Sequence, residues 1–280
     1  MGRLDGQVAL ITGGARGQGR SHAIAMAAEG ADVVICDIAA PVEAIKYPMA
    51  SPDDLEETVR LIEKHGVRGL GIVTDLRDTT QVHSLVERVI DEFGHIDILL
   101  ANHGVVAFST VDQTTDDEWN TVVDTNLTGV FKILREVVPH MKRAGYGRII
   151  ATSSMGARVT HPNLPHYTSA KWGVIGLVKG CALEVANDGI TVNAICPGAV
   201  GTDLFFNQPT YDIFCPDISH PTRDDFEQRL AEHGHGLNGR PYLEAEHVTR
   251  AVMYLVTDTD GVITGQVMEI GLGLSASGIA

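Results

Sequence analysis

The fold is decided by the stretch Val8-Ala9-Leu10-Ile11-Thr12-Gly13-Gly14-Ala15-Arg16-Gly17-Gln18-Gly19, near the start of the chain. Its first five residues form a short apolar run, typical of a strand that is buried on both faces. A helical pattern follows, in which Ile24, Ala27 and Ala28 are spaced for one buried face, and a second apolar run occupies residues 33–37. Strand, glycine-rich turn, helix and strand in this order predict a βαβ unit.

The glycine-rich turn is suited to binding a dinucleotide. Glycines let the backbone turn tightly and approach a pyrophosphate, and the N-terminus of the following helix offers N–H groups to the phosphates. Asp37 ends the second strand, 18 positions after Gly19. A carboxylate there can accept hydrogen bonds from an adenosine ribose and repel a 2′-phosphate, so the pattern favours NAD over NADP.

The rest of the chain continues to alternate strands and helices. Further helices are predicted at about residues 54–65, 79–93, 116–141 with an interruption near 126–129, 167–187 and 245–256, and further strands at 71–74, 96–101, 148–152, 191–195 and 266–270. No linker rich in Pro, Gly or Ser divides the 280 residues. We therefore predict an α/β protein with one domain (residues 1–280), a Rossmann fold whose doubly wound parallel sheet has helices on both faces.

Two stretches do not fit the alternation. Residues 38–52, which we call the first insertion, separate the second strand from its helix, and Ser51 is placed to cap that helix with Pro52 at its first position. Residues 203–242, which we call the lid, are too long for a simple connection and contain several aromatic residues. Both follow the carboxyl ends of strands, where open α/β sheets bind ligands, so we interpret them as walls of a site.

The composition excludes several classes of protein. It is 44% hydrophobic and 20% charged, as in soluble globular proteins, and the formal net charge of −15 argues against nucleic acid and anionic membranes as partners. The chain shows no signal segment and no apolar run that could span a bilayer, so we expect a cytoplasmic protein. The four cysteines are scattered, and the histidines, including His233 and His235, lack further ligands, so no metal is expected.

Tyr167 and Lys171 are four positions apart in the predicted helix 167–187. This spacing places the phenol and the ammonium on one face, where the cation can favour the phenolate. Because a free tyrosine has a pKa of about 10, a nearby cation would have to lower that pKa for the phenol to act as a base at neutral pH. Taken alone, the pattern favours a partly buried tyrosine beside an unrelated surface lysine.

Together with other short motifs, this pair resembles the short-chain dehydrogenase/reductase family over essentially the whole chain. The motifs are Thr12-Gly13-x-x-x-Gly17-x-Gly19, Asp75-Leu76, Ala101-Asn102-His103-Gly104, Asn126, Ser153-Ser154, Tyr167-x-x-x-Lys171 and Pro197-Gly198-x-Val200-x-Thr202. The resemblance implies an NAD-dependent alcohol dehydrogenase or ketone reductase.

The resemblance also assigns catalytic roles to four residues. Tyr167 would be the general acid/base, and Lys171 would in addition hold the nicotinamide ribose. Ser154, 13 positions before Tyr167, would hydrogen-bond the substrate oxygen. The backbone carbonyl of Asn126 would hold a water that connects to the lysine.

For the cofactor, the resemblance implies that Asp75 accepts from the adenine amino group, that Asn102 and Gly104 line the adenosine ribose, and that Val200 and Thr202 hold the carboxamide. The full set of expected NAD-binding residues is Gly13, Arg16, Gly17, Gln18, Gly19, Asp37, Ile38, Asp75, Leu76, Asn102, Gly104, Tyr167, Lys171, Pro197, Gly198, Val200 and Thr202. His103 departs from the family's common Asn-Asn-Ala-Gly, so its role stays open. The roles of His161 and His166, which flank the site, stay open too.

The first insertion and the lid are similar to the mycofactocin-associated, carveol dehydrogenase-like branch of the family. This implies an NAD that is held tightly and reoxidised in place by a redox partner, and the family implies a homotetramer. The aromatic lid favours a hydrophobic, terpenoid-like cyclic alcohol or ketone as substrate. The alternatives are a reductase of a sterol or acyl ketone, and a non-catalytic NAD-binding sensor, which has no need of all four catalytic residues.

Overall fold

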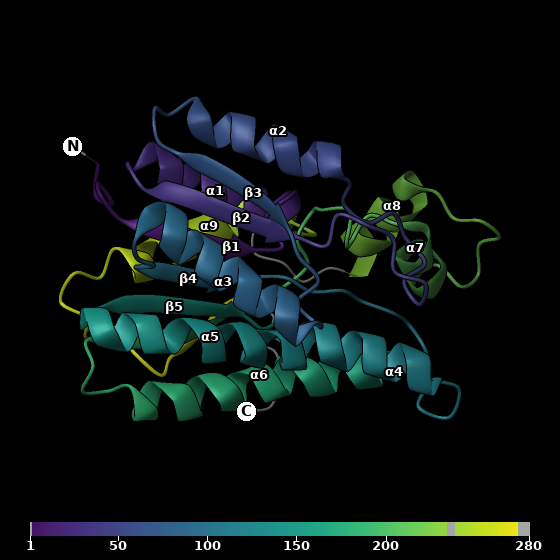
Figure 1. Cartoon of the computed structure of the whole chain (residues 1–280). Helices are drawn as coiled ribbons and strands as arrows, with labels where there is room; N and C mark the ends of the chain where they lie inside the picture. Colours follow the sequence, from purple (N-terminus) through teal and green to yellow (C-terminus); the bar gives the residue numbers. More distant parts are fainter. Residues whose placement is uncertain (1, 234–238, 274–280) are drawn as a thin grey trace.

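The computed structural model describes residues 2–233 and 239–273, which form a parallel sheet covered by helices on both faces (Figure 1). The strand order is β3-β2-β1-β4-β5-β6-β7. The strands are β1 (Val8–Thr12), β2 (Asp32–Asp37), β3 (Gly69–Val73), β4 (Ile98–Ala101), β5 (Gly147–Thr152), β6 (Ile190–Pro197) and β7 (Val267–Ile270). All neighbouring strands are parallel. The predicted Rossmann fold is confirmed.

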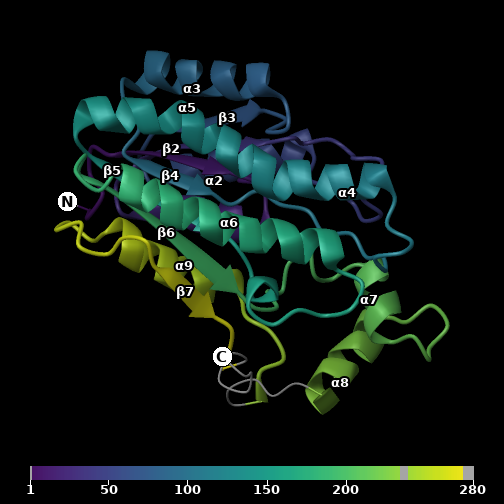
Figure 2. The same cartoon turned by 90° about the horizontal axis from the view of Figure 1, so that it is seen from below.

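Apart from the two helices of the lid, which project from the sheet, the helices lie along its two faces (Figure 2). They are α1 (Gly17–Ala28), α2 (Pro52–Glu63), α3 (Thr79–Phe93), α4 (Asp116–Val123), the π-helix η1 (Asp124–Thr128), α5 (Gly129–Ala144), the 3₁₀-helix η2 (Met155–Ala157), α6 (Pro165–Glu184), α7 (Gln208–Phe214), α8 (Arg223–His233) and α9 (Ala245–Val256). Helices α3, α5 and α6 share one apolar core with the sheet, and α1, α2 and α9 share a second core on the opposite face.

The two cores follow from the apolar runs in the strands. In β1, Val8 and Leu10 point into the first core, whereas Ala9 and Ile11 point into the second. Successive side chains of a strand point to opposite faces, so a strand covered by helices on both sides must be apolar at every position. This is why β1 is fully buried.

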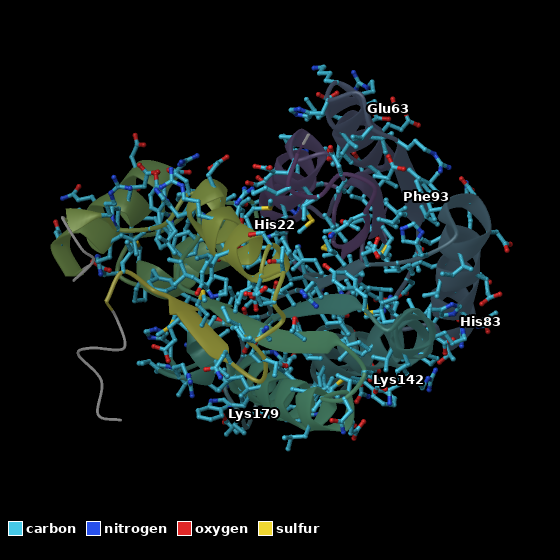
Figure 3. The ribbon with its side chains drawn as sticks, turned by 90° about the vertical axis from the view of Figure 1, so that its left-hand side faces the viewer. His22, Glu63, His83, Phe93, Lys142 and Lys179 are labelled. Atoms are coloured by element: carbon cyan, nitrogen blue, oxygen red, sulfur yellow. The ribbon has the colours of Figure 1, made fainter. Side chains whose placement is uncertain are left out.

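The buried face predicted for α1 is wrong at two positions. Ile24 is only half-buried and Ala28 is exposed, whereas His22 is completely buried. Figure 3 shows His22 in the interior of the molecule. The imidazole Nδ1 lies 2.8 Å from Thr249 Oγ1 of α9, and burial lowers the pKa of His22 to about 3. A neutral histidine between two helices is invisible to a pattern that counts apolar residues.

Two local predictions are confirmed. Ser51 caps α2 by accepting a hydrogen bond from the Asp54 N–H at 3.2 Å, and the Asp54 carboxylate accepts from the Ser51 N–H at 2.8 Å. Pro52 is the first residue of α2, where its missing N–H has no intrahelical acceptor to lose. The interruption expected near residues 126–129 is the π-helix η1 between α4 and α5.

The register of the strands builds the edge at which ligands bind. Thr12 pairs with Cys36 of β2 and with Ala101 of β4, so Asp37 and Asn102 emerge beside the glycine-rich turn. Connections leave β1 and β4 in opposite directions, which opens a crevice between them. Among the described residues, no helix is both long and apolar enough to cross a membrane.

Candidate active site

Two adjoining cavities lie at the carboxyl ends of the strands. The smaller has a volume of about 160 Å³ and is built around the glycine-rich turn. The larger has a volume of about 660 Å³ and lies between β5, β6, the first turns of α6 and the lid. The residues that line both are Gln18, Asn102, Gly104, Thr202 and Leu204. One extended molecule could therefore occupy both cavities.

The predicted NAD-binding residues divide between these cavities. The smaller cavity is lined by Gly13, Arg16, Gly17, Gln18, Gly19, Asp37, Ile38, Asp75, Leu76, Asn102, Gly104 and Thr202. Tyr167, Lys171, Pro197, Gly198 and Val200 line the larger one. The smaller cavity thus suits the adenosine half of a dinucleotide, and the larger one suits its nicotinamide half together with a substrate.

The glycine-rich turn fits a pyrophosphate. A Cβ atom on Gly19 would lie 2.0 Å from the carbonyl oxygen of Gly13, so any side chain there would force the turn open. Gln18 lines both cavities, and its side-chain oxygen Oε1 is buried without a hydrogen-bond partner. A buried acceptor without a partner is costly, so this oxygen suits a hydrogen-bond donor on a bound ligand.

The two acids of the smaller cavity are held differently. Asp37 accepts from the N–H groups of Ala39 and Ala15, both at 3.3 Å, and burial raises its pKa against these hydrogen bonds. Burial also acts to raise the pKa of Asp75, but Arg77, whose Nη2 lies 2.7 Å from Asp75 Oδ2, outweighs it and the pKa is lowered. Asp75 is therefore an ionised acceptor, as a contact with an adenine amino group requires.

The loop after β4 is braced against the end of β1. Asn102 Nδ2 donates to the Gly13 carbonyl at 3.2 Å, and Asn102 Oδ1 accepts from Thr152 Oγ1 at the same distance. His103 is buried with Nδ1 2.7 Å from Thr12 Oγ1. Burial and the charge of Lys171 lower the pKa of His103 to about 3, so the imidazole is neutral where it braces this loop.

The four predicted catalytic residues, Asn126, Ser154, Tyr167 and Lys171, all line the larger cavity. The Ser154 hydroxyl is close enough to the Tyr167 phenol to act on its pKa, which it lowers. Lys171 Nζ donates to the Thr152 carbonyl at 2.8 Å and lies 5.7 Å from the centroid of the Tyr167 ring. The structure therefore brings together residues that are separated by up to 45 positions in the sequence.

A glycine makes this grouping possible. A Cβ atom on Gly104 would lie 2.6 Å from Asn126 Oδ1 and 3.3 Å from Lys171 Nζ. Any side chain at this position would push the asparagine and the lysine apart. Because it has no side chain, Gly104 leaves the space that Asn126 and Lys171 occupy. From the resemblance it was expected only to line the adenosine ribose.

The pKa values differ from the expectation. The Tyr167 pKa was expected to be lowered by Lys171, but burial raises it, and the hydrogen bond from Ser154 only partly opposes this. Burial also lowers the pKa of Lys171, to about 8. The expectation is wrong for the protein chain by itself, because burial disfavours the charged form of each side chain more than its neighbours favour that form.

Asn126 acts through its side chain as well as its place in η1. Its Oδ1 accepts from the Val105 N–H at 3.1 Å, and its Nδ2 donates to the carbonyls of Val105 (2.9 Å) and Val122 (2.8 Å). The side chain thus clamps the loop after β4 to the π-helix. A π-helical turn inside a helix is frequent at functional sites because it re-aims backbone groups. The expected water contact of the Asn126 carbonyl stays a prediction.

The two flanking histidines occupy different environments. His161 is exposed and lines the larger cavity. His166 is buried, does not line either cavity, and accepts from the Tyr167 N–H at 3.0 Å through Nδ1. Of the two, only His161 is placed to touch a substrate. Among residues 2–233 and 239–273, no group of three or more His, Cys, Asp or Glu residues could hold a metal ion, and His235 lies outside these ranges.

The lid has an aromatic core of its own. Phe226 is fully buried, and its ring centroid lies 5.0 Å from that of Phe205, 5.1 Å from that of Tyr211 and 5.4 Å from that of Phe214. The lid residues that line the larger cavity are Leu204, Phe205, Thr210, Phe214, Arg229, Leu230 and Pro241. Most of the aromatic side chains of the lid therefore stabilise it, and only Phe205 and Phe214 also face the cavity.

Four residues of the first insertion were missed as individual contacts. Val42, Tyr47, Met49 and Ala50 line the smaller cavity, and the Tyr47 phenol accepts from the Val106 N–H at 3.2 Å. From the sequence, this segment was expected only to form a wall of the site, without individual contacts. A lone Tyr in a proline-containing loop carries no local signal of what it contacts.

A dinucleotide cavity at the crevice of a parallel sheet, continuous with a cavity that contains Ser, Tyr and Lys side chains, defines a Rossmann-fold oxidoreductase. The family model for short chain dehydrogenase matches residues 7–210. The chain belongs to the short-chain dehydrogenase family, as predicted.

Individual relatives resemble the chain over nearly its whole length. It is 38% identical over 275 residues to (-)-trans-carveol dehydrogenase of Rhodococcus erythropolis, covering 98% of this chain and 99% of that one. The structure of carveol dehydrogenase from Mycobacterium avium in complex with NAD matches with a TM-score of 0.94 and 37% identity, covering 99% of both chains. A short chain dehydrogenase from Mycobacterium paratuberculosis bound to NAD matches with a TM-score of 0.86 and 33% identity, covering 98% and 100%. The predicted resemblance to the carveol dehydrogenase-like branch is confirmed.

Proposed function

We propose that the protein transfers a hydride between NAD and a hydrophobic, ring-shaped secondary alcohol or ketone of the terpenoid type. The observation that carries this proposal is the 660 Å³ cavity, which is lined by Tyr167 and Ser154 together with apolar lid residues. A cavity of this size and lining suits a small apolar substrate with one polar group. The likeness to two carveol dehydrogenases supports the same class of substrate.

The cofactor assignment rests on two kinds of finding. Asp37 ends β2 beside the smaller cavity, where a carboxylate favours a free ribose hydroxyl over a 2′-phosphate. Similar structures contain NAD, and the predicted cofactor is confirmed. NAD, when bound, supplies the acceptor or the donor of the hydride.

The catalytic roles follow from the contacts in the larger cavity. Tyr167 and Ser154 line the same cavity with their hydroxyls near each other, so both can reach one substrate oxygen. Tyr167 would exchange a proton with this oxygen, and Ser154 would hold the oxygen in place. Lys171 adds a positive charge in the cavity, where Thr152 orients it. Asn126 keeps the loop after β4 in position through Val105.

The test is Tyr167→Phe, which removes the phenolic proton and keeps the ring. We expect turnover of cyclic terpenoid alcohols to fall by about 1,000-fold, while NADH still binds. Tyr211→Phe in the lid is the matched control and should be close to wild type. A Tyr167→Phe variant with a near-normal rate would refute the acid/base role. Including a sterol and a 3-oxoacyl substrate in the wild-type assay separates the alternative reductases, and no turnover of any of them would favour the NAD-binding sensor.

The first insertion supports a second part of the proposal, that NAD is held tightly and reoxidised in place by a redox partner. Val42, Tyr47 and Met49 wall the smaller cavity, so the adenosine half is covered by protein. We expect protein purified without added nucleotide to release a stoichiometric amount of NAD when it is denatured. Protein that purifies empty, and that then binds and releases NAD within seconds, would contradict tight retention.

The proposed assembly is a homotetramer in which α6 packs between subunits. Helix α6 exposes Trp172 at 49% and Leu183 at 82%, large apolar surfaces for a helix that also packs on the sheet. Large exposed apolar side chains on one helix favour association with another chain.

A further inference from the structure

Arg16, in the glycine-rich turn, contacts both segments that cover the site. Its Nη2 donates to the carbonyl of Pro48 in the first insertion. Its Nη1 lies 2.9 Å from Oδ2 of Asp203, the first residue of the lid. One guanidinium therefore joins two segments that are 155 positions apart in the chain.

Both contacts lie beside the nucleotide cavity. Tyr47 and Met49, on either side of Pro48, line this cavity, and so do Thr202 and Leu204, on either side of Asp203. Arg16 itself also lines the cavity. If the walls move apart to release a dinucleotide, one or both of the Arg16 contacts must break.

We infer that Arg16 is a positioning residue that clasps the first insertion to the lid and so slows release of the nucleotide. This inference rests on the proposed assignment of the smaller cavity to NAD and adds the residue that controls how long NAD stays. A planar guanidinium with nitrogens that point in different directions can bind two acceptors at once, whereas the point charge of a lysine cannot hold both in the same geometry.

The clasp is distinct from a direct charge contact with the pyrophosphate. Asp203 and the Pro48 carbonyl draw the guanidinium towards the two covers. If Arg16 instead acted mainly on the phosphates, Asp203 would compete with them, and removing its charge would tighten binding. The clasp predicts the opposite sign.

The test measures NADH release by the full-length protein, loaded with NADH and chased with excess NAD in the absence of any alcohol, with NADH fluorescence as the readout. Asp203→Asn removes the acceptor charge of a side chain that is 65% exposed, so it leaves the folded core intact. We expect release to be about 1.5- to fivefold faster, the range for a solvent-exposed ion pair. Arg16→Lys, which keeps the positive charge, should speed release at least as much.

Two comparisons make the result decisive. The double variant Arg16→Lys with Asp203→Asn should release NADH no faster than the faster single variant, because both changes break one link. Asp212→Asn, which removes an exposed lid carboxylate without a contact to Arg16, should release NADH at the wild-type rate.

Three outcomes would overturn the clasp: wild-type or slower release from Asp203→Asn, independent effects that multiply in the double variant, or equal acceleration by Asp212→Asn. Because no alcohol is present, none of these outcomes depends on the identity of the substrate. A failed proposal of function would appear in the Tyr167→Phe assay instead.

Discussion

The first insertion and the lid are both additions at the carboxyl edge of the sheet, but they are held in place by different means. Before Pro52, the first insertion has no helix or strand, and its Ile45 and Tyr47 pack into a cluster with Val105 and Val106 of the loop after β4. The lid contains α7 and α8, which pack around Phe226 and project from the sheet (Figure 2).

The two segments are therefore expected to differ in how easily they move away from the nucleotide and the substrate. A segment that packs against the core opens only at the cost of core contacts, whereas a unit with its own small core can move as one body. The cover of the nucleotide is thus expected to be stable, and the cover of the substrate is expected to open and close. Substitutions in each segment and the pH dependence of the rate test whether the two covers behave differently.

The largest effect on stability and on the KM for the alcohol is expected from Phe226→Ala in the lid. Removing a fully buried ring from the centre of the aromatic cluster should cost the lid about 3–5 kcal/mol. The KM for the alcohol should rise at least about tenfold by loss of the apolar wall, while NADH affinity should fall by no more than the few-fold effect of losing the Arg16–Asp203 contact. Steady-state kinetics and NADH titration check the two halves separately.

Phe226→Leu is the matched control, because it keeps most of the apolar volume and should show a much smaller rise in KM. A Phe226→Ala variant that lost NADH affinity as strongly as alcohol affinity would show that the lid and the nucleotide cover are one structural unit. The lid would then not move independently of the first insertion.

The pH dependence of the rate should be an intermediate effect. Tyr167 accepts a proton only as phenolate, and burial raises its pKa, so alcohol oxidation should become about tenfold faster per pH unit from pH 6 upwards. The rise should end near pH 8, because the pKa of Lys171 is lowered to about 8 and its positive charge is lost above that value. Ketone reduction uses the protonated phenol, which persists throughout this range, so its rate should stay nearly constant from pH 6 to 8.

A profile of kcat/KM between pH 6 and 9 measures this trend. Tyr167 packs in the cluster of the first insertion, so the Phe226→Leu variant of the lid should keep the wild-type profile. A flat wild-type profile below pH 8 would be inconsistent with Tyr167 as the titrating base.

The smallest effect is expected from Tyr47→Phe in the first insertion. It removes only the hydrogen bond from the Val106 N–H, at a cost of about 1 kcal/mol, and should speed NADH release a few-fold with little change in the KM for the alcohol. Stopped-flow release of NADH checks the first expectation and steady-state kinetics the second. A rise in KM with unchanged release would reverse the assignment of the two covers.

Much of the fold could be predicted because its signals are local. Helices α3 and α9 begin and end at the predicted residues, and the Ser51 cap and the break before Gly129 were recognised from adjacent residues. The buried face of α1 was not, because His22 owes its place to Thr249, which is 227 positions away.

The candidate site divides in the same way. The sequence placed Tyr167 and Lys171 on one helical face, and their grouping with Ser154 and Asn126 followed from the resemblance to a family. It did not predict that Gly104 leaves the space in which Asn126 and Lys171 meet, nor that Tyr47 reaches Val106. Contacts of this kind join separate segments and have no periodicity.

By itself, the sequence determined the order of strands and helices, the dinucleotide turn and the spacing of the acid/base pair, since each depends on residues that are close along the chain. Only the tertiary structure decided the direction of the Tyr167 and Lys171 pKa shifts and the link from Arg16 to both covers. The physical reason is that burial and electrostatics depend on every segment that packs around a group, and those segments are brought there by the fold.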